Sequence, residues 1–335
     1  MSGPKAKGRS LQSFMETSFV HISVRGKQVR VPATEAGGYT IVSTGRWLRV
    51  ASIFDEDWDP RSVEDPAAVA AKLKEQSGSD LFTFAQKLPA TQPVFDYPFV
   101  WDNVAAVPIT TYAEWWEKLP QATRRNVRIA EKKNVSTRIV PFDDILVRGI
   151  KGIYDESAAR QGKRFWHYGK DHETVKRENS TYAHRSDFVG AFLGEELIGF
   201  LKIVYVGKVG SIMQILSLSR HVDKKTTNAL IARAVETCAQ KGMSHFVYCQ
   251  YVYGNNTSSP LTEFKRRNGF EQILLPRYYI PLTAKGKLAL KLNAHLGIRR
   301  LIPKRVESAL RSLRARWHER AVPRQASEHS EPSAA

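Results

Sequence analysis

The pattern of apolar and polar positions divides the first hundred residues into short strand-like runs around one helix. Runs in which β-branched and aromatic residues alternate with polar ones predict four strands, at 19–24, 39–43, 47–53 and 81–86. A helix is predicted from Pro66 to Lys74, because Asp65 suits an N-cap and proline suits a first turn. Glycine-containing turns separate these elements.

From residue 111 onward the pattern is more regular. A helix over 111–134 is predicted to be interrupted at Pro120, and its second part is rich in arginine and lysine. The later elements are a strand at 135–140, helices at 143–161 and 171–182, strands at 186–194, 196–206 and 210–219, a helix at 224–241, a strand at 244–250, a helix at 260–268 and one or two strands over 270–282. An antiparallel meander that crosses through a helix into a parallel neighbour forces its strands to splay. A splay forms a slot for an extended ligand, with a helix N-terminus to receive phosphate.

Length and composition narrow the class of protein. The chain has 335 residues and a mass of 37.9 kDa, which suits two packed units or one large one. A content of 42% hydrophobic and 25% charged residues excludes a collagenous, mucin-like or wholly disordered protein. Cys238 and Cys249 are too few for a disulfide framework, and no metal site is predicted. The cysteine usage suits a reducing cytoplasm, and because no apolar run in the sequence is long enough to span a bilayer, we expect a soluble protein.

Charge points to anionic partners. The 51 Lys and Arg residues exceed the 33 Asp and Glu residues by 18, which suits phosphorylated cofactors, nucleic acid or acidic lipid. Twelve basic residues and only two acidic ones lie between 284 and 324. Apolar residues at helical spacing predict basic amphipathic helices over 284–321, which either pack on the protein or contact RNA or, through 284–320, an anionic membrane. The tails at 1–17 and 322–335 are polar and are predicted to be disordered.

Four stretches of sequence carry a resemblance to a known family. They are the arginine-rich segment 119–135, the strand pair 187–200, the helix from Asn228 to Gly242, and the segment 261–270 with its Asn-Gly-Phe ending. Together with the element order, they make the chain resemble the GNAT superfamily of N-acetyltransferases. The similarity is closer to the FemAB-like branch, in which two such halves occur in tandem. It covers about residues 115–283.

The resemblance implies a fold and a division of the chain. The fold class is α/β, with a GNAT-like mixed, splayed β-sheet flanked by helices. We expect a degenerate GNAT-like half at 18–115, a GNAT-like acyltransferase domain at 116–283, and the basic helices after it.

The resemblance also implies where a donor binds. In the family, the strand before the long helix bonds the pantetheine arm, and the next loop holds pyrophosphate through an Arg/Gln-x-x-Gly-x-Gly/Ala motif. The glycines are absent here, as they often are in FemAB-like relatives, so the donor is expected to be acetyl-CoA, another acyl-CoA or an aminoacyl-tRNA. An asparagine pair near the last helix either binds the pantetheine amides or forms a turn and helix cap. The predicted donor-binding residues are Gln214, Ile215, Leu216, Lys224, Lys225, Thr226, Thr227, Asn228 and Asn256.

Acyl transfer needs a proton donor for the departing group. The last helix has Phe264 and Lys265 in the region where acetyltransferases of this type commonly place a tyrosine. Tyr251 and Tyr253, just beyond the strand that ends near Gln250, are the candidates, because a phenol there can donate to a thiolate or an ester oxygen. Packing of both rings as ordinary strand aromatics is the alternative.

A basic and aromatic loop at 160–170 is expected to receive the acceptor. It joins two early helices that flank the acceptor in this superfamily, and its side chains require partners. His167 and Glu156 are candidate bases, although a structural hydrogen bond and an i,i+4 ion pair with Arg160 also explain them. The predicted acceptor-binding residues are Arg160, Lys163, Arg164, Trp166 and Tyr168.

The sequence therefore predicts an N-acyltransferase. It would move an acyl or aminoacyl group to a primary amine by direct attack, without a covalent enzyme intermediate. The acceptor is a small molecule or a peptide amine, and tRNA is a further expected partner if it carries the donor group. The alternative is a non-catalytic basic module of degenerate transferase fold that binds RNA or an anionic membrane surface.

Overall fold

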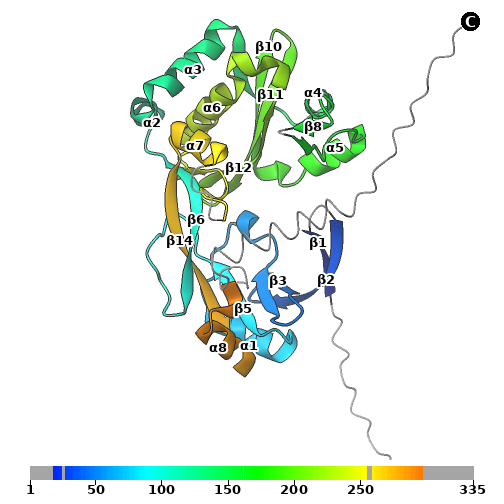
Figure 1. Ribbon diagram of the computed structural model, residues 1–335, viewed down its shortest axis with the longest axis vertical. Helices are drawn as coiled ribbons and strands as arrows, with labels where there is room; N and C mark the ends of the chain where they lie inside the picture. The colour runs from blue at the N-terminus through cyan, green and yellow to red at the C-terminus, as the bar shows by residue number, and fades with distance from the viewer. Residues whose placement is uncertain (1–17, 25–26, 161, 255–258, 297–335) are drawn as a thin grey trace, which may run out of the picture.

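A single twelve-stranded mixed sheet runs through the molecule (Figure 1). The computed structural model describes residues 18–24, 27–160, 162–254 and 259–296. The predicted disordered tails, Asn256 and the predicted basic helices beyond residue 296 lie outside these ranges. Within them, no helix is both long enough and apolar enough to cross a membrane.

The strands and helices follow the chain in this order. The strands of the large sheet are β1 (Ser18–Val24), β2 (Lys27–Ala36), β3 (Tyr39–Thr44), β4 (Val50–Ile53), β5 (Leu81–Ala85), β6 (Phe99–Pro108), β7 (Val135–Val140), β10 (Ser186–Leu193), β11 (Glu196–Val206), β12 (Val209–Ser217), β13 (His245–Val247) and β14 (Glu271–Pro281). A separate small hairpin consists of β8 (Ala159–Arg160) and β9 (Lys163–Arg164). The α-helices are α1 (Pro66–Gln76), α2 (Tyr112–Lys118), α3 (Gln121–Lys132), α4 (Asp144–Tyr154), α5 (His172–Asn179), α6 (Thr226–Gln240), α7 (Pro260–Arg267) and α8 (Ala284–Lys291). Short 3-10 helices are η1 (Glu56–Trp58), η2 (Ala183–Arg185), η3 (Ser219–Lys224) and η4 (Ala294–Leu296).

Side-chain caps explain where several helices begin. Asp65, Asp143, Asp171 and Ser259 each accept a hydrogen bond from the amide three residues later, which satisfies one of the donors that a helix start leaves unpaired. Helix α6 has no such cap, and Lys225 before it has a left-handed backbone with φ of 56°. The first amides of α6 therefore have no capping side chain of this kind to accept their hydrogen bonds.

The C-terminal part of the sheet is an antiparallel meander followed by a parallel crossover. Strands β7, β10, β11 and β12 are neighbours in the order 7-10-11-12, and α6 then leads to β13, which pairs parallel with β12. Helices α3 and α6 cover one face of these strands, and α4 and α5 cover the other (Figure 1). The main hydrophobic core fills the space on both sides, because the strands carry apolar residues on both faces.

The N-terminal part repeats this topology and exchanges a strand with the C-terminal part. Strands β1 to β4 form a meander, and α1 leads to β5, which pairs parallel with β4. Strand β6 follows β5 in the sequence but pairs with β13. Strand β14 follows β13 in the sequence but pairs with β5 and β6. Each half is thus completed by a strand from the other. The division into halves near residue 115 stays a prediction, and the sheet itself is continuous.

The structure corrects several predicted elements. The helix expected over 143–161 ends at Tyr154, because the residues after it leave the helix to bond with β12 and its following loop. The strand expected over 244–250 spans only His245–Val247 as a β13 element. The strand expected over 47–53 begins at Val50, and β2 and β6 were not predicted at all. The polar pair Asp102 and Asn103 interrupts the apolar pattern of β6, which tertiary pairing with β13 and β14 overrides.

Helix α8 is fastened to the N-terminal part through Asp80. The carboxylate of Asp80 bonds Lys285 Nζ at 2.8 Å, Thr283 Oγ1 at 2.9 Å and the Arg49 amide at 2.9 Å. Although burial alone would raise it, these donors hold the pKa of Asp80 below its usual value. Gly286 packs directly on the Asp80 carbonyl, so a methyl group at that position would overlap the carbonyl oxygen.

Replacing Gly286 tests this packing. We expect Gly286→Ala to lower the free energy of unfolding by about 1–3 kcal/mol, because the overlapping atom belongs to the backbone and can move only with β5. Gly152→Ala is the matched control, since Gly152 lies in α4 with open space around it and alanine should stabilise the helix by about 0.5–1 kcal/mol. Urea unfolding of both variants measures the difference. Equal stability of the two variants would contradict the assignment.

Candidate functional site

Strands β12 and β13 pair for three residues and then separate. The parallel pairs run from Val209↔His245 to Ser211↔Val247. Beyond them, β12 stays paired with β11 as far as Ser217, whereas the chain after β13 follows β6, with Tyr248 N donating to Ala105 O at 2.8 Å. This is the predicted splay. We call the space between 212–217 of β12 and 248–253 the strand gap.

A β-bulge in β12 lies where the gap opens. The register with β11 pairs Ile203 with Ile212 but Lys202 with Gln214, so Met213 is an extra residue. A bulge bends its strand and increases the local twist. The bulge therefore turns β12 away from β13 at the residue where their pairing ends.

A cavity of about 610 Å³ lies at the closed end of the strand gap. Ser211 and Ile212 of β12 and Val247 of β13 line it, together with Cys249, Gln250 and Tyr253 beyond β13. The opposite wall comes from the N-terminal part, with β14, and includes Glu56, Asp57, Trp58, Lys87, Leu88, Asp102 and Arg277. We call it the vertex cavity. Both halves of the molecule are needed to enclose it.

Arg277 organises the charged wall of the vertex cavity. Its Nε lies 2.6 Å from Asp102 and its Nη1 lies 2.9 Å from Glu56. Although burial alone would lower it, the two carboxylates raise the pKa of Arg277. Glu56 also accepts from the Ala85 amide at 2.7 Å, at the end of β5 where β4 no longer pairs. In the N-terminal half, β4 and β5 separate as β12 and β13 do, but the Glu56 side chain bridges the space between them.

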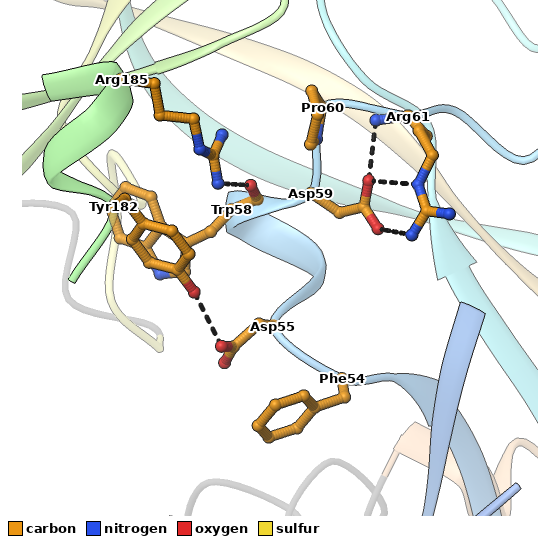
Figure 2. Close-up of a pocket in the computed structure, with 8 residues that line it drawn as sticks. All are labelled: Phe54, Asp55, Trp58, Asp59, Pro60, Arg61, Tyr182 and Arg185. Carbon is orange, nitrogen blue, oxygen red and sulfur yellow. Dashed lines mark hydrogen bonds and ion pairs between the residues drawn. The ribbon is translucent and has the colours of Figure 1, made fainter. Parts of the chain in front are cut away.

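Helix η1 is held against the C-terminal half by an aromatic and polar contact. Figure 2 shows Trp58 beside Tyr182, whose ring centroids are 5.9 Å apart, and the Tyr182 hydroxyl donating to Asp55 at 2.7 Å. Arg185 donates to the Trp58 carbonyl in the same view. These residues surround a shallow pocket of about 290 Å³. The contact fixes Glu56 and Asp57 at the wall of the vertex cavity.

Of the two predicted tyrosines, only Tyr253 lines the vertex cavity. Burial and the neighbouring Cys249 raise the pKa of Tyr253 to about 12, so its phenol stays protonated at neutral pH. Tyr251 packs against the main core instead.

Lys265 is a fully buried cation behind the same wall. Its Nζ donates to the Gln250 carbonyl and lies 4.7 and 4.8 Å from the ring centroids of Tyr248 and Tyr253. Burial lowers the pKa of Lys265, and no carboxylate pairs with it among the described residues. Lys265 therefore fastens α7 to the segment that has left β12.

The loop predicted to hold the donor phosphates, residues 219–228, follows β12 at the open end of the strand gap, and we call it the donor loop. Lys224 and Lys225 carry no ion pair within the described part of the chain, and Lys225 has the left-handed backbone noted above. The Thr226 hydroxyl is buried without a hydrogen-bond partner, and Thr227 Oγ1 lies 3.3 Å from Ser217 Oγ. Asn228 donates to Asn268 at 2.9 Å. The loop cations and the first amides of α6 thus lie next to the C-terminal end of β12.

Gln214, Ile215 and Leu216 lie on the part of β12 that borders the strand gap. Ile215 and Leu216 pack partly against the core. The side-chain oxygen of Gln214 accepts from the Tyr154 hydroxyl at 2.8 Å, and its side-chain nitrogen lies 3.1 Å from His167 Nε2. Among the described residues, no strand pairs with the outer edge of these three residues.

His167 is buried and neutral at neutral pH. Burial first, and then Lys170 and Arg160, lower the pKa of His167 to about 4. Its ring packs between Tyr154 and Trp166, with centroids 4.2 and 3.6 Å away. The role as a base stays a prediction, while the geometry gives His167 a structural hydrogen bond.

Glu156 is fully engaged by backbone donors. Its two oxygens accept from Ser219 N at 2.7 Å and Arg220 N at 2.9 Å, and Arg160 lies 3.2 Å away. Although burial alone would raise it, these amides hold the pKa of Glu156 below its usual value. Glu156 therefore ties the loop after α4 to the start of the donor loop, and its role as a base stays a prediction.

The predicted acceptor residues do not line the vertex cavity. Among the described residues of 155–170, none belongs to its wall. Arg160 donates to the Ser217 carbonyl at 3.0 Å, at the end of β12 away from the vertex. Lys163, Arg164, Trp166 and Tyr168 are all exposed in the same loop. Asn256, predicted to bind the donor, is not among the described residues.

Sequence reasoning missed the residues contributed by the N-terminal half and by β14. Glu56, Asp102 and Arg277 were not singled out, although a charged residue inside the apolar run 273–280 was a detectable signal. No pattern within the sequence brings Glu56 and Arg277 together across 221 positions. Within the described ranges, no group of three His, Cys, Asp or Glu residues could hold a metal ion.

Comparison with known proteins identifies the fold. FemX superposes with a TM-score of 0.50 at 9% sequence identity, over 78% of this chain and 87% of that one. L-PGS from Bacillus licheniformis gives a TM-score of 0.49 at 16% identity, over 78% and 88%. The C-terminal domain of a putative lysylphosphatidylglycerol synthetase from Agrobacterium fabrum gives 0.48 at 12%, over 77% and 86%. No protein-family model and no curated protein sequence matches the chain.

The predicted fold is therefore confirmed. The likeness to FemX and the mixed, splayed sheet show a FemAB-like, GNAT-like fold. At this level of identity the likeness extends to the fold alone.

The neutral state of His167 predicts a pH dependence of stability. The pKa of His167 is about 4 in the folded protein and 6.5 in an unfolded chain, so the unfolded state takes up the proton first as pH falls. The free energy of unfolding should then drop between pH 6.5 and 4, by up to about 3 kcal/mol from this group. We expect His167→Gln to flatten this drop in urea unfolding, and exposed His184→Gln to leave it unchanged. An unaltered drop in His167→Gln would contradict the burial argument.

Removing the buried ammonium of Lys265 should loosen the segment beyond β13. Lys265→Met leaves the Gln250 carbonyl without its donor, and we expect the free energy of unfolding to fall by about 1–3 kcal/mol. Lys72→Met, on the exposed face of α1, is the matched control and should change it by less than about 0.5 kcal/mol. Urea unfolding measures both variants. A Lys265→Met protein as stable as the control would show that Lys265 does not hold α7 to the segment beyond β13.

Proposed function

We propose that this protein is an N-acyltransferase that moves an acyl or aminoacyl group from a phosphorylated carrier to a primary amine. The observation that carries the proposal is the strand gap. A paired sheet has no room for a ligand between neighbouring strands, whereas β12 keeps one free backbone edge inside the sheet. A thin carrier with amide groups fits that edge, because it can replace the missing strand.

The two ends of the strand gap suit the two ends of such a donor. Lys224, Lys225 and the first amides of α6 at the open end suit phosphate, which the positive end of a helix also attracts. The vertex cavity at the closed end is where the reactive carbonyl would lie. Both acyl-CoA and aminoacyl-tRNA meet this description, since each has a phosphate-rich end and a reactive ester or thioester.

The charges that line the vertex cavity suit an amine acceptor, although the chain as a whole is strongly basic. Its wall combines the carboxylates Glu56, Asp57 and Asp102 with three cations, Lys87, Lys208 and Arg277. The carboxylate of Asp57 has no ion pair within the described ranges. A primary amine entering here meets no excess of positive charge, so the acceptor would bind opposite β12 and not at the 155–170 loop.

The reaction would be a direct attack. The acceptor nitrogen bonds to the donor carbonyl carbon, and the bond from that carbon to the carrier sulfur or oxygen breaks. Tyr253 gives its phenolic proton to the departing thiolate or alkoxide, and the proton lost by the nitrogen restores the phenol. Lys265 holds the segment that carries Tyr253 in place.

Donor binding gives the first test. Acetyl-CoA and charged tRNA are each incubated with the protein and a panel of primary amines, and transfer of the labelled group is measured. A bound donor should also raise the melting temperature by mass action. If heparin gives the same shift, salt abolishes it, and no labelled group is transferred from either donor, the protein is a polyanion-binding module instead.

Replacing Tyr253 tests the proton donor. We expect Tyr253→Phe to lower kcat by at least about 100-fold while the donor KM stays the same, because only the proton transfer is lost. Tyr251→Phe is the matched control, since Tyr251 does not line the vertex cavity, and it should keep wild-type kcat. A full kcat in Tyr253→Phe would exclude the phenol as proton donor.

A further inference from the structure

The shallow pocket in Figure 2 is a joint between the two halves of the molecule. Its four charged side chains are already bonded inside it, in the pairs Asp55 with Tyr182, Asp59 with Arg61, and Arg185 with the Trp58 carbonyl. A ligand would have to displace one of these bonds to gain a polar contact with those groups. Two of the pairs connect η1 to residues of the C-terminal half. We call these two pairs the η1 joint.

Both partners of the Tyr182–Asp55 hydrogen bond have strained backbones. The φ angle is 55° at Tyr182 and 53° at Asp55, in the left-handed region that residues other than glycine rarely adopt. Such a residue costs roughly 1–3 kcal/mol and persists only where its surroundings hold it. Ser186 Oγ donates to the Tyr182 carbonyl at 2.6 Å, and Trp58 N donates to the Asp55 carbonyl at 2.8 Å. The η1 joint is therefore held in one conformation from both sides.

Arg185 connects the joint to the sheet. One arm of its guanidinium donates to the Trp58 carbonyl and the other donates to the Tyr205 carbonyl at 2.9 Å. Tyr205 lies in β11 and pairs with Gly210 of β12, and its neighbour Val206 lines the vertex cavity. Arg185 thus fixes the position of η1 relative to the strand pair that carries the strand gap.

The segment held by the joint is also the wall of the vertex cavity. Trp58 lines both the shallow pocket and the vertex cavity, and Glu56 and Asp57 line the vertex cavity. Glu56 is held from the other side, by the Ala85 amide and by Arg277. Helix η1 is therefore held at both ends. Loss of the joint would free its Trp58 end to move relative to β12.

We propose that Tyr182 and Arg185 are positioning residues for the acceptor. They act through η1, because they hold Asp57 and Trp58 where an acceptor amine would lie against the donor carbonyl. The inference rests on the proposed function, which places the acceptor at this wall. A displacement of about 1 Å between reacting groups is enough to lower a rate on the order of 100-fold, so the joint controls how well the acceptor is used.

Kinetics of Tyr182→Phe test the positioning role. This variant loses the bond to Asp55 but keeps its ring beside Trp58, and burial with Asp55 raises the pKa of Tyr182 to about 12, so the wild-type phenol is protonated and donates. We expect kcat/KM for the acceptor to fall roughly 10-fold, mainly through the acceptor KM, while the donor KM is unchanged. Tyr205→Phe is the matched control, because it loses an equally long 2.7 Å bond to Asp187, and it should keep all three constants.

Changes at the partner residues extend this test. Asp55→Ala should match Tyr182→Phe, and the double variant should be no worse than either, because both remove the same bond. Asp55→Asn keeps an acceptor oxygen and tolerates the left-handed backbone, so it should restore most of the activity. Arg185→Lys keeps the charge but loses the planar fork that bonds two carbonyls, and it should act in the same direction as Tyr182→Phe.

Cys249 gives a measurement that needs no transfer reaction. It lines the vertex cavity, whereas Cys238 is fully buried in the main core. Burial raises the pKa of the Cys249 thiol, and although Lys265 and Tyr253 oppose the rise, the Asp57 carboxylate adds to it. The thiol therefore responds to the position of η1. If η1 moves away, the thiol becomes more accessible and more easily ionised.

Alkylation by iodoacetamide measures this response. We expect Tyr182→Phe and Asp55→Ala to be alkylated at Cys249 about 3- to 10-fold faster than the wild type, and Tyr205→Phe to be alkylated at the wild-type rate. Peptide mass spectrometry identifies the modified cysteine, and melting temperatures show that each variant is folded.

The positioning role and the proposed function fail in different ways. Wild-type alkylation and wild-type acceptor kinetics in Tyr182→Phe would overturn the joint, as would an equal change in Tyr205→Phe, which would indicate general destabilisation. Faster alkylation with unchanged acceptor kinetics would overturn the positioning role and leave the acyltransferase standing. Faster alkylation in a protein that transfers no group to any amine would overturn the acyltransferase and leave the joint as the contact that holds η1.

Discussion

The unpaired edge of β12 is the constraint on which the rest of the structure depends. Backbone N–H and C=O groups inside a sheet are normally all paired, so a strand that leaves its neighbour after three residues must be held elsewhere. The bulge at Met213 turns β12 towards β11, and the chain after β13 forms hydrogen bonds with β6. Lys265 then binds the Gln250 carbonyl from behind. These three features together keep the strand gap open.

The two halves share a topology but use it differently. In the N-terminal half, the parallel pair β4 and β5 also separates, yet Glu56 bonds the Ala85 amide and bridges the space. The same carboxylate holds Arg277, so the bridge becomes one wall of the vertex cavity. The exchange of β6 and β14 makes this possible, since Arg277 belongs to the C-terminal strand that completes the N-terminal half. One half thus supplies the gap and the other supplies its far wall.

Buried charges in this molecule serve to hold segments together. Lys265 and Lys202 lie in the interior and donate to backbone carbonyls, Lys202 to those of Asn179 and Thr181 at the end of α5. Burial lowers the pKa of Lys202 to about 8, so desolvation costs free energy that the carbonyl bonds offset. Glu156 is negatively charged and also holds two segments together, because its carboxylate oxygens accept hydrogen bonds from amides at the start of the donor loop. Among the described residues, the lining of the vertex cavity sets three carboxylates, Glu56, Asp57 and Asp102, against three cations, Lys87, Lys208 and Arg277.

The sequence by itself determined the order of the large-sheet strands from β7 onward, the fold class and the region of the splay. Those properties follow from periodicity, capping residues and turn chemistry, which act over a few positions, as at Asp143 before α4 and Ser259 before α7. Only the tertiary structure decided that helix α4 stops at Tyr154, that Tyr253 and not Tyr251 lines the vertex cavity, and that Glu56 meets Arg277. Such outcomes depend on pairing between distant strands, and a local pattern contains no information about which strand a given segment joins.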